Sequence, residues 1–185
     1  MALSKEVLDT IAFSKENGFD KLNLAPPEET RKAMAKAAQD AGPTVVATVI
    51  SKNITDHSIP VRIYIPFGEG PFPMISYYHG GGFVLMGLET HDEICRQICE
   101  NTGCIVMSVG YKLAPEHPYP QGPETSVAAA IWLHEQASEY NGSSESMAVA
   151  GDRSLQRQSP VIPGKWEGLC AYCGNHEMVL GQLCH

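Results

Sequence analysis

Three short and mostly apolar segments, at residues 74–78, 105–109 and 147–150, place the strongest constraint on how this chain can fold. None of them shows the alternation expected of a strand with one wet face, so each is expected to lie buried on both faces of a sheet. Helical stretches at residues 90–101 and 123–140 separate them, and a helix between two strands lets those strands run parallel. The sequence therefore predicts an α/β fold, with a parallel sheet covered by helices on both faces.

The elements before the first of these segments follow a different order. Residues 4–17 and 27–41 show helical patterning, and the second stretch begins with Pro27 and two glutamates, which suit the first turn of a helix. Two segments rich in β-branched residues follow, at 44–55 and 59–65, with turn-forming residues between them. We expect two helices followed by an antiparallel pair of strands.

Charge and composition restrict the classes of function. The chain has 185 residues, with 13 Lys plus Arg against 21 Asp plus Glu. Binding to nucleic acid needs clustered cations, so a nucleic-acid partner is not expected. The N-terminus carries charges where a secretory signal needs an apolar run, and no segment is apolar enough to predict a membrane span. We expect a cytoplasmic protein.

The glycine cluster His79–Phe83 directly follows the apolar segment at residues 74–78. Glycines after a strand leave several backbone N–H groups unshielded, and such groups can converge on an oxygen that gains negative charge during acyl transfer. A plain flexible turn is the alternative interpretation of three glycines. The preceding strand, the histidine at the head of the cluster and the aromatic residue at its end favour an oxyanion site.

Three segments together carry a family resemblance: His79–Phe83, Tyr111–Pro120 and Val149–Asp152. In their order and spacing, the chain resembles the hormone-sensitive-lipase-like esterases and lipases of the α/β-hydrolase superfamily. The resemblance implies a serine acyl-enzyme mechanism, a small acyl-ester substrate and no cofactor. It also implies N-terminal cap helices over residues 1–42 and a partial α/β-hydrolase core over residues 43–152, truncated after the strand that leads to the nucleophile.

The resemblance assigns roles to individual residues of the first and third segments. The backbone N–H groups of Gly80 and Gly81 would form most of an oxyanion hole. His79, Gly82 and Asp152 are the other motif residues at the site.

The other histidines and the cysteines before residue 153 are not expected to be functional. His117, in the second segment, is interpreted as a packed loop residue ahead of a catalytic base. Cys95 and Cys99 lie four residues apart on a predicted helix and, like Cys104, are expected to be buried free thiols. Three histidines in turn or helix contexts are expected at the surface: His57, His91 and His134.

The chain departs from the family pattern directly after Asp152. The family continues with Ser-Ala-Gly-Gly, a strained turn that presents the nucleophilic serine, whereas this chain has Arg153 at the serine position. An arginine side chain has no nucleophilic oxygen and stays protonated. Ser154 is the alternative nucleophile, but Asp152 and Gln156 would then occupy positions where the turn needs glycine. No intact catalytic residue is expected.

Residues 153–185 match nothing in the family and are expected to form an unrelated, poorly ordered tail. They contain no alternation of strands and helices that would position the acid and the histidine of a triad. We favour an origin of this segment in a shifted reading frame or an alternative exon. The tail also contains zinc-type ligands, although their spacing fits no zinc finger, with the candidate set Cys170, Cys173, His176 and Cys184.

Two classes of function remain open on the sequence. The first is a carboxylic-ester hydrolase by lineage that is inactive or nearly so. The second is a non-catalytic fragment or interaction module, with the tail as a candidate metal site. In both classes, the strand at residues 147–150 would leave an unpaired apolar sheet edge, which favours self-association.

Overall fold

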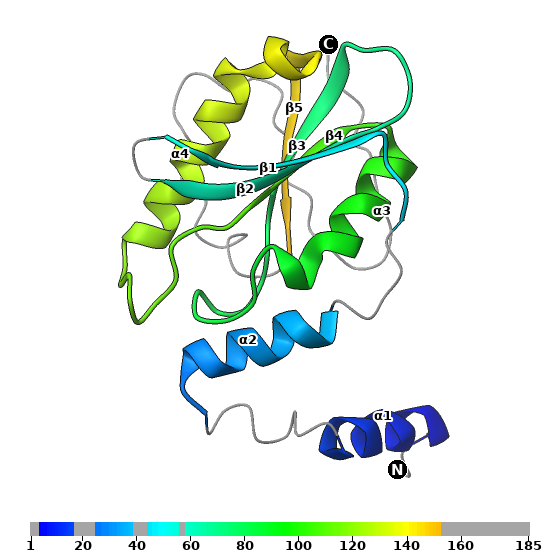
Figure 1. Ribbon diagram of the computed structural model, residues 1–185, viewed down its shortest axis with the longest axis vertical. Coiled ribbons are helices and arrows are strands. Elements are labelled where there is room, and N and C mark those ends of the chain that lie inside the picture. Colours follow the sequence, from blue (N-terminus) through cyan, green and yellow to red (C-terminus); the bar gives the residue numbers. More distant parts are fainter. Residues whose placement is uncertain (1–3, 17–24, 39–43, 56–57, 153–185) are drawn as a thin grey trace.

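The computed structural model describes residues 4–16, 25–38, 44–55 and 58–152. Five strands form one sheet in the spatial order β1-β2-β4-β3-β5, with helices around it (Figure 1). The strands are β1 (Thr48–Ile54), β2 (Ile59–Ile65), β3 (Phe72–Tyr78), β4 (Ile105–Val109) and β5 (Gly142–Gly151).

The sheet is mixed, with its antiparallel part at one end. β1 pairs antiparallel with β2, with Thr48 opposite Ile65, and β2 is also antiparallel to β4. β3 runs parallel to both β4 and β5. The predicted antiparallel pair and the predicted parallel strands are therefore both confirmed.

Two helices cover opposite faces of the sheet (Figure 1). The side chains of β3 alternate between them. Tyr77 belongs to a buried cluster with the cysteines of α3 (Asp92–Thr102), whereas Tyr78 belongs to a second cluster with Leu133 of α4 (Gln121–Glu135). Burial on both faces explains why the central strands lack polar alternation.

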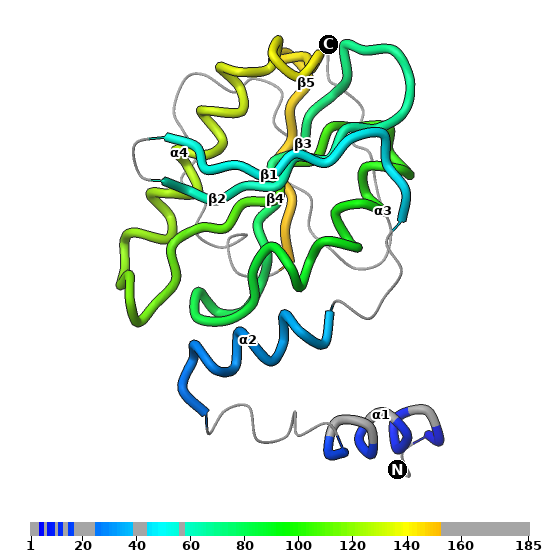
Figure 2. The backbone as a smooth tube through the Cα atoms, in the orientation of Figure 1, coloured from blue at the N-terminus to red at the C-terminus, as the bar shows by residue number. Residues whose placement is uncertain are grey.

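The two N-terminal helices precede the sheet, as predicted. They are α1 (Lys5–Glu16) and α2 (Pro27–Ala38). Figure 2 shows α2 between α1 and the core, beside the loops that follow β3 and β4. None of the helices in the described ranges is both long and apolar enough to cross a membrane.

The start of α3 differs from its sequence pattern. The spacing of Thr90 and Glu93 predicts a capping box, in which each side chain bonds to the other's backbone. The Thr90 hydroxyl instead accepts the N–H of Gly87 at 3.0 Å and donates to its carbonyl at 2.8 Å. Glu93 accepts the N–H of Thr44 at 2.8 Å. A short 3-10 helix, Glu89–His91, leads into α3, and the predicted capping box is wrong because both side chains bond elsewhere.

Two elements differ in length from their sequence patterns. β5 begins well before its apolar segment, because Gly142 already pairs with Phe72 of β3. The helix predicted over residues 123–140 is divided, since α4 ends at Glu135 and a 3-10 helix, Ala137–Tyr140, follows. Among the described residues, β5 pairs only with β3, so its other edge is open there.

The three cysteines of the described core are buried and free, as predicted. Burial raises the pKa of Cys95 to about 12 and that of Cys99 to about 11, because a low-dielectric environment disfavours the thiolate. At neutral pH these side chains are thiols of the core and not nucleophiles.

Candidate active-site loop

The parallel pairing of β3 with β5 brings the glycine cluster and Asp152 together. Tyr78, the last residue of β3, lies opposite Gly151, the last residue of β5. The segments that follow two parallel neighbours leave the sheet at the same edge, where open α/β sheets bind their ligands. Here these segments are His79–Phe83, which we name the glycine loop, and Asp152.

The glycine loop is a tight turn whose shape requires glycine at Gly81. The φ angle of Gly81 is +109°, and its carbonyl accepts the N–H groups of Val84 at 3.1 Å and Leu85 at 2.9 Å. A Cβ atom on Gly81 would lie 2.2 Å from the carbonyl oxygen of Leu85. No side chain can be placed there without moving the backbone, so the turn has one defined shape.

Asp152 fixes the first residue of the turn. Its Oδ1 accepts the N–H of Gly80 at 2.6 Å and the hydroxyl of Tyr77 at 3.2 Å. Its Oδ2 lies 3.4 Å from Nε2 of His91. Partial burial raises the pKa of Asp152, but His91, the Gly80 N–H and the Tyr77 hydroxyl lower it by more, so the pKa lies below the ordinary 3.8. At neutral pH the side chain is therefore a carboxylate that accepts the Gly80 N–H.

The bond to Asp152 occupies the N–H of one of the two glycines predicted to form the oxyanion hole. The N–H of Gly80 donates a short hydrogen bond to the Asp152 carboxylate, so this donor is already used within the fold. The assignment of Gly80 and Gly81 to an oxyanion hole stays a prediction.

His79 supports the loop from the interior. Its ring is buried and stacks on Tyr111, with 4.4 Å between the ring centroids. Its Nδ1 lies 2.7 Å from the carbonyl oxygen of Gly80, and the Tyr111 hydroxyl donates to the carbonyl of His79 at 2.6 Å. Burial lowers the pKa of His79 to about 4, because it disfavours the charged imidazolium. The ring is neutral at pH 7 and holds backbone rather than relaying protons.

His91 corrects one prediction. A surface position is expected from the sequence, but the residue is only 4% exposed, and its ring centroid lies 5.6 Å from that of His79. Its Nδ1 is 2.8 Å from the hydroxyl of Thr90, and its Nε2 faces Asp152. The signal was present in the spacing, because His91 lies four residues before Cys95, whose burial is predicted, and residues four apart share a helix face.

The remaining candidates are placed as follows. His117 is half-buried in its loop, with Nδ1 3.0 Å from Oε1 of Gln121, and His134 is exposed on α4, as predicted. In the part of the chain that the structure describes, no group of three His, Cys, Asp or Glu side chains is placed to hold a metal ion. The other candidates lie outside the described residues: His57, Arg153, Ser154, Cys170, Cys173, His176 and Cys184.

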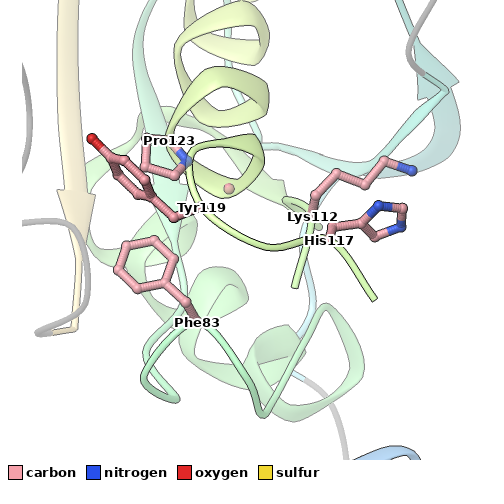
Figure 3. A pocket seen from close by; sticks show the side chains of 6 residues that line it. Phe83, Lys112, His117, Tyr119 and Pro123 are labelled. Carbon is pink, nitrogen blue, oxygen red and sulfur yellow. The ribbon is translucent and has the colours of Figure 1, made fainter. Parts of the chain in front are cut away.

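A small hollow lies beside the glycine loop (Figure 3). Its volume is about 140 Å³. Phe83, Tyr119 and Pro123 lie on one side of it, and the polar ends of Lys112 and His117 point away from them on the other. Small-molecule sites usually measure about 300–1,000 Å³. As formed by the described residues, the hollow is smaller than a usual small-molecule site.

Comparisons with known proteins agree with the motifs. A family model for the alpha/beta hydrolase fold matches residues 75–154. The carboxylic ester hydrolase LipN of Mycobacterium tuberculosis is 36% identical over 157 residues, which are 82% of this chain and 42% of that protein. The carboxylesterase NlhH of the same organism is 48% identical over 116 residues, which are 62% of this chain and 36% of that protein. The chain thus spans less than half the length of these relatives.

A solved structure has the same fold over most of this chain. The ester hydrolase EH1AB1, from the metagenome of Lake Arreo, superposes with a TM-score of 0.75 at 34% sequence identity, over 86% of this chain and 53% of that one. The family resemblance rests on three observations that agree: the strand order, the position of the glycine loop after β3, and these matches. The chain carries part of an α/β-hydrolase fold, and its similarity to carboxylic ester hydrolases confirms the predicted resemblance to the hormone-sensitive-lipase-like esterases of that superfamily.

Proposed function

We propose that this chain carries the oxyanion loop of a carboxylic-ester hydrolase but does not itself turn over esters. The observation that carries the proposal is the defined turn at Gly81, which lies next to Asp152 at the edge where β3 and β5 end. The named relatives are carboxylesterases, which supports a small acyl ester as the ligand class.

The proposed donor is the backbone N–H of Gly81. During acyl transfer the carbonyl oxygen of the ester gains negative charge, and a preformed N–H donor stabilises that charge without having to reorganise. Asp152 contributes indirectly. Its carboxylate accepts the N–H of Gly80 and thereby fixes the position of the residue directly before Gly81.

The proposed loss of turnover follows from the residue after Asp152. In the family this residue is the serine that attacks the ester, and here it is Arg153. A guanidinium group stays protonated and has no free lone pair with which to attack the ester, so it cannot form an acyl-enzyme. Donor N–H groups alone give only a small part of the rate that a complete triad supports.

Hydrolysis of a chromogenic short-chain ester tests both parts. We expect the 185-residue chain to give no turnover above background, and Ser154→Ala to give the same rate as the parent. An active carboxylesterase measured in parallel shows that the assay works. Turnover by the parent that disappears in Ser154→Ala would mean that Ser154 is the nucleophile and that the proposal is wrong.

The open edge of β5 favours a second candidate function, a non-catalytic interaction module. Among the described residues this edge has no partner strand, and an exposed strand edge pairs readily with another chain. We propose that the partner is a second copy of this chain, which associates through the open edge of β5. Metal binding by the tail and a cytoplasmic location stay predictions.

Size-exclusion chromatography over a range of concentrations tests the second candidate. We expect an apparent mass above that of a monomer, and we expect Ser144→Lys, a charge on an exposed position of β5, to shift the chain toward the monomer. Asn53→Lys makes a similar change on β1, at the opposite edge of the sheet, and should leave the mass unchanged. A stable monomer at every concentration would contradict self-association.

A further inference from the structure

We propose that Arg31 is a positioning residue that ties helix α2 to the glycine loop. The proposal rests on the oxyanion role proposed above for that loop. Arg31 lies on α2, more than forty positions before the loop in sequence, and its side chain is 21% exposed. It bonds to two separate loops at the edge of the sheet where the glycine loop lies.

The guanidinium group of Arg31 meets acceptors on both loops. Its Nε donates to the carbonyl of Val84 at 2.6 Å, and its Nη2 donates to the carbonyl of Ala114 at 2.6 Å. Both Nη atoms also bond to the carboxylate of Glu116, each at 3.0 Å. One planar group thus satisfies two backbone carbonyls and one carboxylate.

The two loops that Arg31 holds are also joined to each other. The N–H of Ala114 donates to the carbonyl of Phe83, the last residue of the glycine loop, at 2.8 Å. Val84 follows Phe83, and its N–H closes the turn onto the carbonyl of Gly81. Arg31 therefore bonds to the carbonyl of Val84, the same residue whose N–H closes the turn. A displacement of α2 would for this reason shift the proposed donor at Gly81.

Only arginine has the geometry for this set of acceptors. Its five N–H donors lie in one rigid plane, whereas a lysine ammonium is a compact charge on a flexible stem. A lysine at position 31 would keep the positive charge and lose the simultaneous bonds to Val84, Ala114 and Glu116. Charge conservation and loop positioning can therefore be separated by experiment.

Hydrogen exchange at the amides of Val84 and Leu85 tests the proposal, because both N–H groups donate to Gly81. In the full chain, we expect these amides to exchange at least about tenfold faster in Arg31→Ala and in Arg31→Lys than in the parent. The amide of Val106, in the centre of the buried strand β4, reports whether the fold as a whole has been weakened. We expect its exchange to stay unchanged.

Lys32→Ala is the matched control, because Lys32 lies on the same helix and, among the described residues, forms its ion pair along the helix surface, with Glu28 at 2.7 Å. We expect no change at Val84 and Leu85 in this variant. Unchanged exchange of both amides in Arg31→Ala, or equal acceleration in Lys32→Ala or at Val106, would overturn the proposal. The measurement does not depend on ester hydrolysis, so its failure and that of the proposed function are distinguishable.

Discussion

Gly81→Ala is expected to lower the free energy of unfolding by about 3 kcal/mol, because two costs add at this position. A φ of +109° lies where L-residues are strained, and the new methyl group would lie 2.2 Å from the carbonyl oxygen of Leu85. The clash is with backbone, so no rotamer change relieves it. Moving Leu85 would break the 2.9 Å bond between its N–H and the Gly81 carbonyl.

Gly82→Ala is the control for the first of these costs. Gly82 also has a positive φ, +63°, but a Cβ there would meet no atom of the described chain within 4 Å. Its loss should be limited to the left-handed backbone, about 1 kcal/mol. Urea unfolding of both variants and the parent measures the difference. Equal losses in the two variants would contradict the steric requirement for glycine that distinguishes Gly81 from Gly82.

Asp92→Ala is expected to cost about 3 kcal/mol, near the lower end of what breaking a buried ion pair costs. The Asp92 carboxylate accepts bonds from Arg62 at 2.7 Å, Arg96 at 2.6 Å and the hydroxyl of Tyr64 at 2.8 Å. Its side chain is 22% exposed and those of the two arginines 15% and 18%. Alanine would leave two mostly buried guanidinium groups without this carboxylate, and although Arg62 would keep the Glu89 carboxylate at 2.6 Å, Arg96 would lose its ion-pair partner. Glu100→Ala changes an exposed acid on the same helix and should cost less than about 0.5 kcal/mol.

The loss should depend on pH in one direction. Burial raises the pKa of Asp92, but the bonds from Arg96, Arg62 and Tyr64 lower it by more, so the net pKa lies below the ordinary 3.8. A carboxyl group whose pKa is lower in the folded state stabilises the fold fully above its unfolded pKa, and this contribution is lost as the pH falls through the folded value. In urea unfolding, the difference between the parent and Asp92→Asn should be constant near neutral pH and shrink below about pH 4. A difference that grows on acidification would contradict the assignment.

Sequence patterns predicted an element correctly where residues close together in the chain determine it. The segment rich in β-branched residues at 59–65 and the apolar segment at 105–109 form β2 and β4 over those same residues. Gly103 ends α3 in a left-handed conformation, φ 65°, as a glycine after a helix predicts. The strand order had no such local cause, since β4 lies between β2 and β3 although it follows both in the chain.

The candidate site was only partly predictable, because its contacts join distant parts of the chain. The motifs located the glycine loop and Asp152, but the bond that joins them spans 72 positions, from Gly80 to Asp152. Tyr77 and Tyr111 were not predicted as site residues, because an aromatic residue in or after an apolar strand looks like core. Both are core residues, and their hydroxyls are also donors to Asp152 and to the carbonyl of His79.

β3 and β5 end opposite each other. The shape of the glycine loop and the nucleophile of the family, which an enzyme normally inherits together, therefore depend on separate segments of the chain. The partners described here for the glycine loop, from Arg31 to Asp152, all come before position 153. In the family, the nucleophile lies one residue beyond that boundary. A gene altered at that point would lose chemical turnover in a single step, while the sequence that shapes the glycine loop stays whole.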